Sequence, residues 1–110
     1  MTATRRPISI AIIALVYLTV GIVGFGYHFK EILAPDGIAI ELTEFLAIVA
    51  GVFLLRSQNW ARWLALAWIA FHVVLSAFHP LPELLVHCLF CAVIAWLLFR
   101  PSAAAYFRRI

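Results

Sequence analysis

The chain has 110 residues, of which 66% are hydrophobic and only 12% are charged. A soluble domain of this size has too much surface for so apolar a composition, and the long apolar blocks predict transmembrane helices instead. The formal charge of +3 does not indicate nucleic-acid binding, because the arginines fall at predicted helix ends, where they meet lipid head groups.

The sequence predicts four membrane helices joined by short turns. The first apolar block follows Arg5 and Arg6, as in a signal peptide. It is too long for one and no A-x-A site follows, so we expect a retained helix. Pro7 suits the first turn of that helix. In chain order the predicted helices are residues 7–29, 38–55, 60–79 and 84–99, and the tail, 102–110, is predicted to lie along the membrane interface.

Each predicted helix is roughly 27–33 Å long at about 1.5 Å per residue, which is enough to cross a bilayer. Short turns make sequential helices antiparallel neighbours. The expected fold is therefore all-α, with a single domain over residues 1–110 that forms an up-down-up-down four-helix bundle within the membrane.

Basic residues predict the orientation of this bundle. Seven of the eight lie on one side of the predicted membrane, namely Arg5, Arg6, Arg56, Arg62, Arg100, Arg108 and Arg109. Only Lys30 lies on the other side. Because lysine and arginine accumulate on the cytoplasmic side of membrane proteins, both termini are predicted to be cytoplasmic.

Acidic residues and histidines gather at the opposite, extracytoplasmic end. They are Glu31, Asp36, Glu41, Glu44 and Glu83 with His28, His72, His79 and His87. An ionisable side chain at membrane depth is costly, so it is by default a functional-site hypothesis. This cluster is the main indication of function in the sequence.

Helical periodicity places these residues on one polar stripe per helix, in its outer half. The stripes are Tyr17, Gly21, Gly24, His28 and Glu31 on the first helix, Glu41, Glu44, Ile48 and Gly51 on the second, His72, Ser76 and His79 on the third, and Glu83, His87 and Cys91 on the fourth. Small residues in a membrane helix mark the side where a neighbour comes close, so the stripes of the first two helices are predicted to face inward.

Three of these residues are predicted to form the core of a metal site. Glu44, His72 and His87 come from different helices and each lies about 8–10 Å below the outer surface, at about 1.5 Å per residue. Two histidines and a carboxylate suit a divalent transition metal such as Zn, Fe or Cu. Shallower groups are predicted to complete the coordination or to orient the ligands: His28, His79, Glu41 and Glu83.

Other interpretations of the same residues stay open. A hydrogen-bond network could use the three deep groups only to hold helices together. His72 and His87 could instead supply both axial ligands of haem b. Glu41 and Glu83 fall near predicted helix starts, where the helix dipole favours an acid. His28 and His79 lie near an interface that tolerates histidine.

Cys88 and Cys91 form a CxxC pair within the fourth predicted helix. Cysteine is a common small apolar residue in membrane helices, so an inert pair is one interpretation. A redox pair is the other, because four-helix quinone-linked enzymes similar to vitamin K epoxide reductase carry CxxC near the outer end of their fourth helix. This chain lacks that family's additional loop cysteines and long first loop. A membrane thiol or quinone oxidoreductase is therefore the alternative function.

The layout resembles the DoxX-like group of small bacterial membrane proteins. The residues that carry this resemblance are YLTVG at 17–21, EFLAIVAGVFLL at 44–55 and WARW at 60–63. The resemblance covers all four helices through topology and a glycine-bearing second helix, and it implies a multi-pass protein of the bacterial inner membrane. Some members are associated with quinone-linked sulfur oxidation. The match transfers no catalytic residue.

The function predicted from the sequence is metal binding at a buried His/Glu site near the extracytoplasmic face, with a redox-linked role as an extension. No catalytic triad, phosphate loop or nucleotide motif is present, so the sequence does not decide whether the chain is an enzyme. A non-catalytic accessory subunit is a further alternative. The predicted partners are the lipid bilayer and a second copy or larger membrane complex, and no nucleic acid.

Overall fold

The structure is a computed structural model that describes residues 6–107. Every regular element in this part of the chain is a helix. In chain order they are α1 (Ile8–His28), the 3-10 helix η1 (Phe29–Glu31), α2 (Gly37–Leu55), α3 (Asn59–Ser76), α4 (Leu81–Phe99) and α5 (Pro101–Phe107). The four predicted helices are present, and most of their ends lie within one residue of the predicted ones.

The turn between α3 and α4 differs most from the prediction. The third helix ends at Ser76 rather than at 79, and the fourth begins at Leu81 rather than at 84. Pro82 lies in the first turn of α4. A proline there is tolerated because the first backbone N–H groups of a helix have no partner within it. The helix therefore includes this proline instead of starting after it.

α2 and α3 are joined by a tight turn that makes these helices antiparallel. Ser57 has φ 56°, the left-handed conformation that usually selects glycine. The backbone N–H of Ser57 donates to Leu54 O at 3.2 Å, and that of Gln58 donates to Phe53 O at 3.0 Å. This pair of bonds is a Schellman motif, which satisfies carbonyls at the end of α2 and reverses the chain within a few residues.

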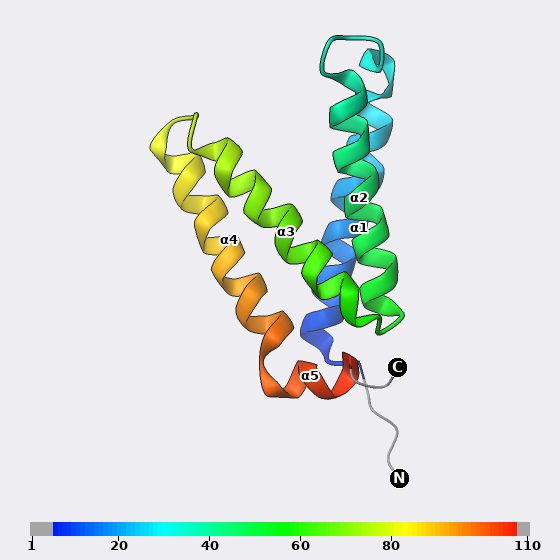
Figure 1. The fold of residues 1–110 in the computed structure, drawn as a ribbon, viewed down its shortest axis with the longest axis vertical. Coiled ribbons are helices and arrows are strands. Elements are labelled where there is room, and N and C mark those ends of the chain that lie inside the picture. The colour runs from blue at the N-terminus through cyan, green and yellow to red at the C-terminus, as the bar shows by residue number, and fades with distance from the viewer. Residues whose placement is uncertain (1–5, 108–110) are drawn as a thin grey trace.

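The four long helices form two antiparallel hairpins (Figure 1). We call α1 with α2 the first hairpin and α3 with α4 the second hairpin. α1 packs closely along α2, the two hairpins meet mainly through α2 and α3, and α4 contacts α1 only slightly. The hairpins are close together near α5 and diverge toward the turns at 29–36 and 77–80 (Figure 1). The molecule is a flat wedge, 52 Å long and 18 Å thick.

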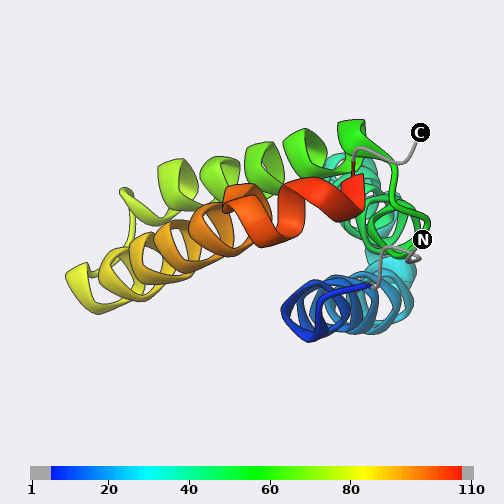
Figure 2. The ribbon, with the colours of Figure 1, turned by 90° about the horizontal axis from the view of Figure 1, so that it is seen from below.

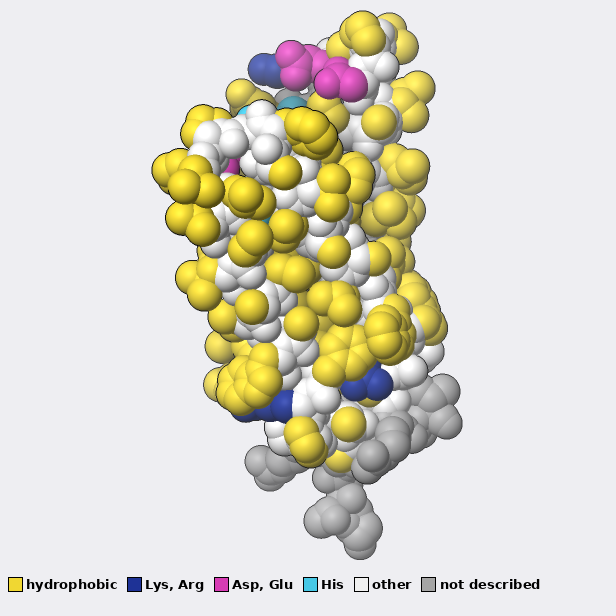
Figure 3. Space-filling model, turned by 60° about the vertical axis from the view of Figure 1, so that its left-hand side comes forward, with side chains coloured by type: hydrophobic (Ala, Val, Ile, Leu, Met, Phe, Trp, Pro, Cys, Tyr) yellow, Lys and Arg dark blue, Asp and Glu magenta, His cyan; other side chains and the backbone are white. Residues whose placement is uncertain are grey.

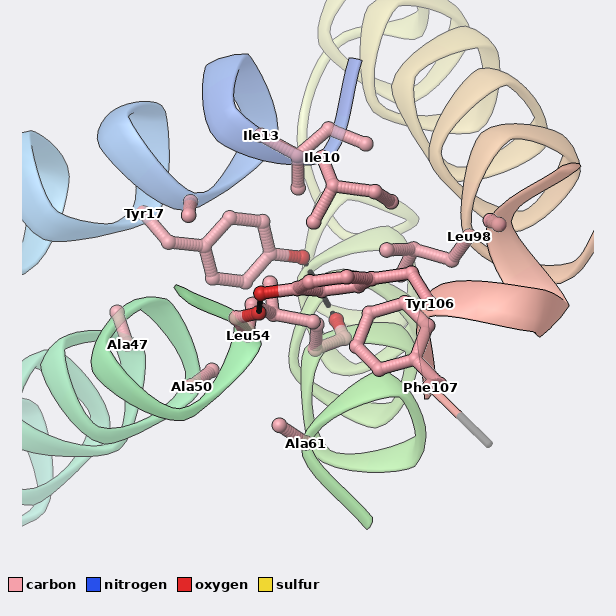
Figure 4. Packing of buried hydrophobic residues seen from close by; sticks show 13 residues of the cluster. Ile10, Ile13, Tyr17, Ala47, Ala50, Leu54, Ala61, Leu98, Tyr106 and Phe107 are labelled. Carbon is pink, nitrogen blue, oxygen red and sulfur yellow. Dashed lines mark hydrogen bonds between the residues drawn. The ribbon is translucent and has the colours of Figure 1, made fainter. Parts of the chain in front are cut away.

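The buried core lies at the narrow end of this wedge, where α5 crosses the helix ends (Figures 1 and 2). Figure 4 shows apolar side chains from α1, α2, α4 and α5 meeting there, including Ile10, Leu54, Leu98, Tyr106 and Phe107. The Tyr106 hydroxyl lies 3.0 Å from Leu54 O and 2.7 Å from Leu55 O. The α5 segment, predicted to lie along the membrane interface, thus packs into the core, and 108–110 lie outside the described residues.

Charged side chains separate to the two ends of the wedge, with a broad apolar band between them (Figure 3). We call the end with the turns 29–36 and 77–80 the polar end. We call the end with α5 the basic end; its described basic residues are Arg6, Arg56, Arg62 and Arg100. Arg5, Arg108 and Arg109 of the predicted cytoplasmic set lie outside the described residues. The charge separation predicted from the sequence is therefore seen along the length of the described molecule.

Within residues 6–107, three segments are long and apolar enough to cross a membrane: Ile8–Glu31, Gly37–Leu55 and Leu81–Phe99. α3 is not among them, and it carries Asn59, Arg62 and His72. Large apolar side chains are exposed along α4, among them Leu85, Leu89 and Phe90. Such a surface suits contact with lipid rather than with water. The protein is therefore a membrane protein.

Candidate functional site

The first hairpin places the Glu44 carboxylate between its two helices. Gly24 of α1 has no side chain, and a Cβ there would overlap the Glu44 carboxylate. One turn deeper, a Cβ at Gly21 would lie 2.6 Å from the Ile48 side chain. The glycines therefore allow α2 to approach α1 closely, with Glu44 lying against the bare backbone. The two stripes were predicted to face inward, and at these glycines they face each other.

Glu41 lies one turn nearer to the polar end and is almost completely enclosed. Its side chain is 4% exposed, and within the described chain neither carboxylate oxygen has a hydrogen-bond partner. Glu44 lies within electrostatic range of both Glu41 and His28. A buried carboxylate without partners is costly unless a cation or a hydrogen bond compensates it. These three groups therefore form one ionisable cluster in the first hairpin.

Glu41 and Glu83 were both interpreted as acids that the dipole favours at a helix start, and this interpretation fits only one of them. Glu83 lies in the first turn of α4, where the positive end of the helix dipole favours a carboxylate. Its carboxylate lies 3.8 Å from Nδ1 of His79, and both side chains are more than half exposed. Glu41, in contrast, is the fifth residue of α2, beyond its first turn. The dipole thus accounts for Glu83 but not for Glu41.

His28 lies beside a hollow at the tip of the first hairpin. The hollow has a volume of about 350 Å³ and is lined by His28, Glu31, Ala34, Asp36, Gly37 and Ile40. Nδ1 of His28 lies 2.9 Å from Gly24 O. The hollow therefore combines one imidazole with two carboxylates at the surface of the polar end.

The second hairpin brings His72 and His87 together. Their ring centroids are 6.5 Å apart and the ring planes differ by 17°. Nδ1 of His72 lies 2.8 Å from Trp68 O, and Nδ1 of His87 lies 2.8 Å from Glu83 O. A carbonyl oxygen only accepts hydrogen bonds, so Nδ1 must carry the proton in both rings. The Nε2 lone pair is then free to bind a ligand.

His28 makes the same contact with the carbonyl four residues before it. Three of the four histidines therefore share one tautomer, in which Nε2 carries the lone pair. Backbone carbonyls commonly orient metal-binding histidines in this way. The sequence did not predict these bonds and carries no signal for them, because every residue within a helix has a backbone carbonyl four residues before it.

The seven predicted ligands do not converge on one point. Among residues 6–107, no group of three or more His, Cys, Asp or Glu side chains is arranged to hold a metal ion. Glu41, Glu44 and His28 belong to the first hairpin, and His72 and His87 to the second. The hairpins diverge toward this end (Figure 1). Depth along a helix was predictable from the sequence, but the lateral distance between hairpins depends on the angle at which they pack.

Two aromatic residues that the sequence did not single out as functional join the hairpins next to these groups. Trp68 Nε1 donates to Thr43 O at 2.8 Å, and the Tyr17 hydroxyl donates to Ala65 O at 2.6 Å. The Tyr17 and Trp68 rings lie 5.2 Å apart. The position of Trp68 four residues before His72 is the signal in the sequence that could have indicated it.

Cys88 and Cys91 are free thiols within the continuous helix α4. Cys88 is exposed and Cys91 is half-buried. Cys91 follows His87 by one helical turn, so it lies on the same side of α4. A redox role for the pair stays a prediction.

Comparison of the chain with family models, with curated proteins and with solved structures gives no match. The resemblance to DoxX-like proteins therefore stays a prediction, and the function has to be argued from the residues of the polar end.

Proposed function

We propose that the chain is a multi-pass protein of the bacterial inner membrane in which α1 to α4 all cross the bilayer. α3 runs antiparallel to α4 and packs beside it, which supports a crossing despite its polar residues. Because the basic end carries Arg6, Arg56, Arg62 and Arg100, that end and both termini belong on the cytoplasmic side. The polar end then faces the extracytoplasmic side.

The function that we propose for the polar end is the binding of a divalent transition metal, namely Zn, Fe or Cu. The observation that carries this proposal is the His72–His87 pair, in which both Nδ1 atoms contact backbone carbonyls and neither Nε2 atom has a hydrogen-bond partner within residues 6–107. Two imidazoles that share an ion at about 2.0–2.1 Å place their ring centres roughly 5 Å apart at a tetrahedral angle and roughly 6.4 Å apart on opposite sides of the ion. The separation of 6.5 Å therefore fits two ligands on opposite sides of an ion, and a tetrahedral site requires the rings to move closer together.

Glu44 is the carboxylate proposed to accompany these histidines, since it lies at a similar depth on the facing hairpin. His28 and Glu41 are its neighbours in the first hairpin. His79 and Glu83 lie at the exposed rim of the second hairpin. The proposed site thus has a histidine pair, a carboxylate cluster opposite it, and a polar rim toward the extracytoplasmic surface.

Elemental analysis with an absorption spectrum of the detergent-purified protein tests this function. We expect about one equivalent of metal per chain, lost in His72→Ala and in His87→Ala, because each removes one of the two imidazoles. Phe78→Ala is the control, since Phe78 is 83% exposed in the same hairpin and offers no ligand. A folded, metal-free wild-type protein would contradict the proposal and would favour an accessory subunit.

The same spectrum distinguishes the alternatives. A Soret band in place of stoichiometric metal ion would identify His72 and His87 as haem b ligands. If instead the pair Cys88 and Cys91 carries the function, the protein would be metal-free and its thiols would oxidise reversibly. Cys→Ser at both positions would then abolish its reaction with a quinone.

A further inference from the structure

Trp68 occupies the junction between the two hairpins at the depth of the candidate site. Its indole Nε1 donates to Thr43 O of α2 at 2.8 Å, and its ring packs 5.2 Å from Tyr17 of α1. Trp68 itself belongs to α3, so one side chain connects three helices. The Tyr17 hydroxyl of the first hairpin donates to Ala65 O of the second. Among the described residues, these are the only two side-chain hydrogen bonds between the hairpins at mid-depth.

His72 depends on Trp68 through two contacts. Nδ1 of His72 donates to the Trp68 carbonyl at 2.8 Å, which sets the tautomer. The imidazole also packs against the indole in a tilted arrangement, with centroids 4.0 Å apart and planes 34° apart. The backbone contact would persist whatever residue stood at position 68. The ring contact depends on the indole, whose Nε1 donates to Thr43 O.

The acceptor of the Trp68 bond is next to the proposed carboxylate ligand. Thr43 immediately precedes Glu44 in α2, so a hydrogen bond to the Thr43 carbonyl positions the backbone from which Glu44 extends. His72 and Glu44 come from different hairpins, and the hairpins diverge beyond this point (Figure 1). The indole thus contacts the histidine on one side and the carboxylate's own segment on the other.

We propose that Trp68 is the positioning residue of the candidate metal site: its indole orients the His72 ring and sets the distance between His72 and the Glu44 segment of α2. This inference rests on the proposed metal binding, and it adds Trp68, which is not one of the predicted ligands, to the residues of the site. A residue that holds a metal-binding histidine in its binding orientation raises metal affinity, because no free energy is then spent on ordering the histidine when the ion binds.

Titration of the purified full-length protein with Co²⁺ tests the proposal. Trp68→Phe keeps an aromatic ring for His72 but removes the donor to Thr43. We expect its dissociation constant to rise about 10- to 100-fold, the range seen when a group that orients a ligand is lost. We also expect its ligand-field spectrum at saturation to differ from that of the wild type, a change that a loss of stability alone would not produce.

Tyr17→Phe is the matched control. It removes the other hydrogen bond to α3 near this depth but does not touch His72, so its Co²⁺ affinity and spectrum should equal those of the wild type. Equal weakening in both variants would show that only helix packing matters and would overturn the positioning role. Wild-type affinity in Trp68→Phe would also overturn it. If the wild type itself binds no Co²⁺, the proposed function fails as well.

A second measurement covers the case in which Trp68→Phe does not fold. Trp60, Trp63 and Trp96 are 47%, 58% and 62% exposed. Replacing them with phenylalanine keeps an aromatic ring at each position and leaves Trp68 as the single tryptophan, which can be excited selectively over the tyrosines. Bound Co²⁺ should quench the Trp68 emission, since the centre of the His72 ring lies 4.0 Å from that of the indole. The Co²⁺ concentration at half-maximal quenching should equal that at half-maximal ligand-field absorbance. Unquenched emission at saturation would overturn the proposal.

Discussion

Glu41 is the one acidic side chain in the described chain that is fully buried, at 4% exposure. Neither oxygen has a hydrogen-bond partner within that part of the chain. Burial between α1 and α2 removes this carboxylate from water, and its neighbour Glu44 is also an acid. A carboxylate in this state destabilises the fold.

Replacing the Glu41 carboxylate with an apolar side chain of similar volume should therefore stabilise the protein. Glu41→Met removes both unpartnered oxygens, and we expect the free energy of unfolding in detergent to rise by about 1–3 kcal/mol. Glu31→Met, at an exposed position in η1, is the control and should change little. A loss of stability in Glu41→Met would mean that the carboxylate has a partner in the folded protein.

At the scale of single helices, the first hairpin is built from small residues at the contact between α1 and α2. A Cβ at Gly51 would lie 2.7 Å from Cγ of Leu18, and one at Gly21 would meet the Glu44 carbonyl at 2.8 Å. Ala47 and Ala50 of α2 are fully buried. Apolar helices gain little from the hydrophobic effect inside a membrane, so such close backbone packing is what holds the pair together.

Gly21→Ala should weaken the first hairpin, because its added methyl group meets backbone atoms that cannot rotate away. We expect a loss of about 1–3 kcal/mol in the free energy of unfolding, the usual range for an overpacked contact. Gly26→Ala is a matched control on the same helix, since a Cβ there has nothing within 4 Å. Thermal unfolding of both variants in one detergent measures the difference, and equal behaviour of the two would refute this account of the packing.

At the scale of the whole molecule, α5 holds the hairpins together at the basic end while the polar end stays open. The Tyr106 hydroxyl reaches two carbonyls at the end of α2. Arg6 donates to Tyr106 and to Leu55 O, and Arg100 donates to Ser9 at 3.2 Å. Phe107, at 1% exposure, completes the core. All four long helices thus meet near α5, and the wedge widens with distance from it.

Removing the Phe107 ring should therefore destabilise the whole molecule. Phe107→Ala is expected to cost about 3–5 kcal/mol in unfolding free energy, the range for a large side chain deleted from a packed core. Phe90→Ala deletes the same ring from an exposed position on α4, at 52% exposure, and should cost much less. Similar losses in the two variants would show that α5 does not hold the helix ends together.

The sequence by itself determined the helices, their order and the separation of charge along the molecule. Apolar block length and turn residues predict these features because they depend on neighbours along the chain. Depth is likewise a local quantity, so Glu44, His72 and His87 could be placed in one layer. The facing stripes of α1 and α2 were also predictable, since glycines such as Gly21 and Gly24 leave only one side for a close neighbour.

Only the tertiary structure decided the angle between the hairpins and the place of the final segment. That angle results from bulky contacts such as Trp68 against Tyr17 and from the packing of Phe107, which no local pattern encodes. It separates the Glu44 cluster from the histidine pair, although all lie at similar depth. The tertiary structure also places Trp68 in contact with both Thr43 and His72. The sequence could not predict this, because contacts between distant segments depend on side-chain volume and packing rather than on position along a helix.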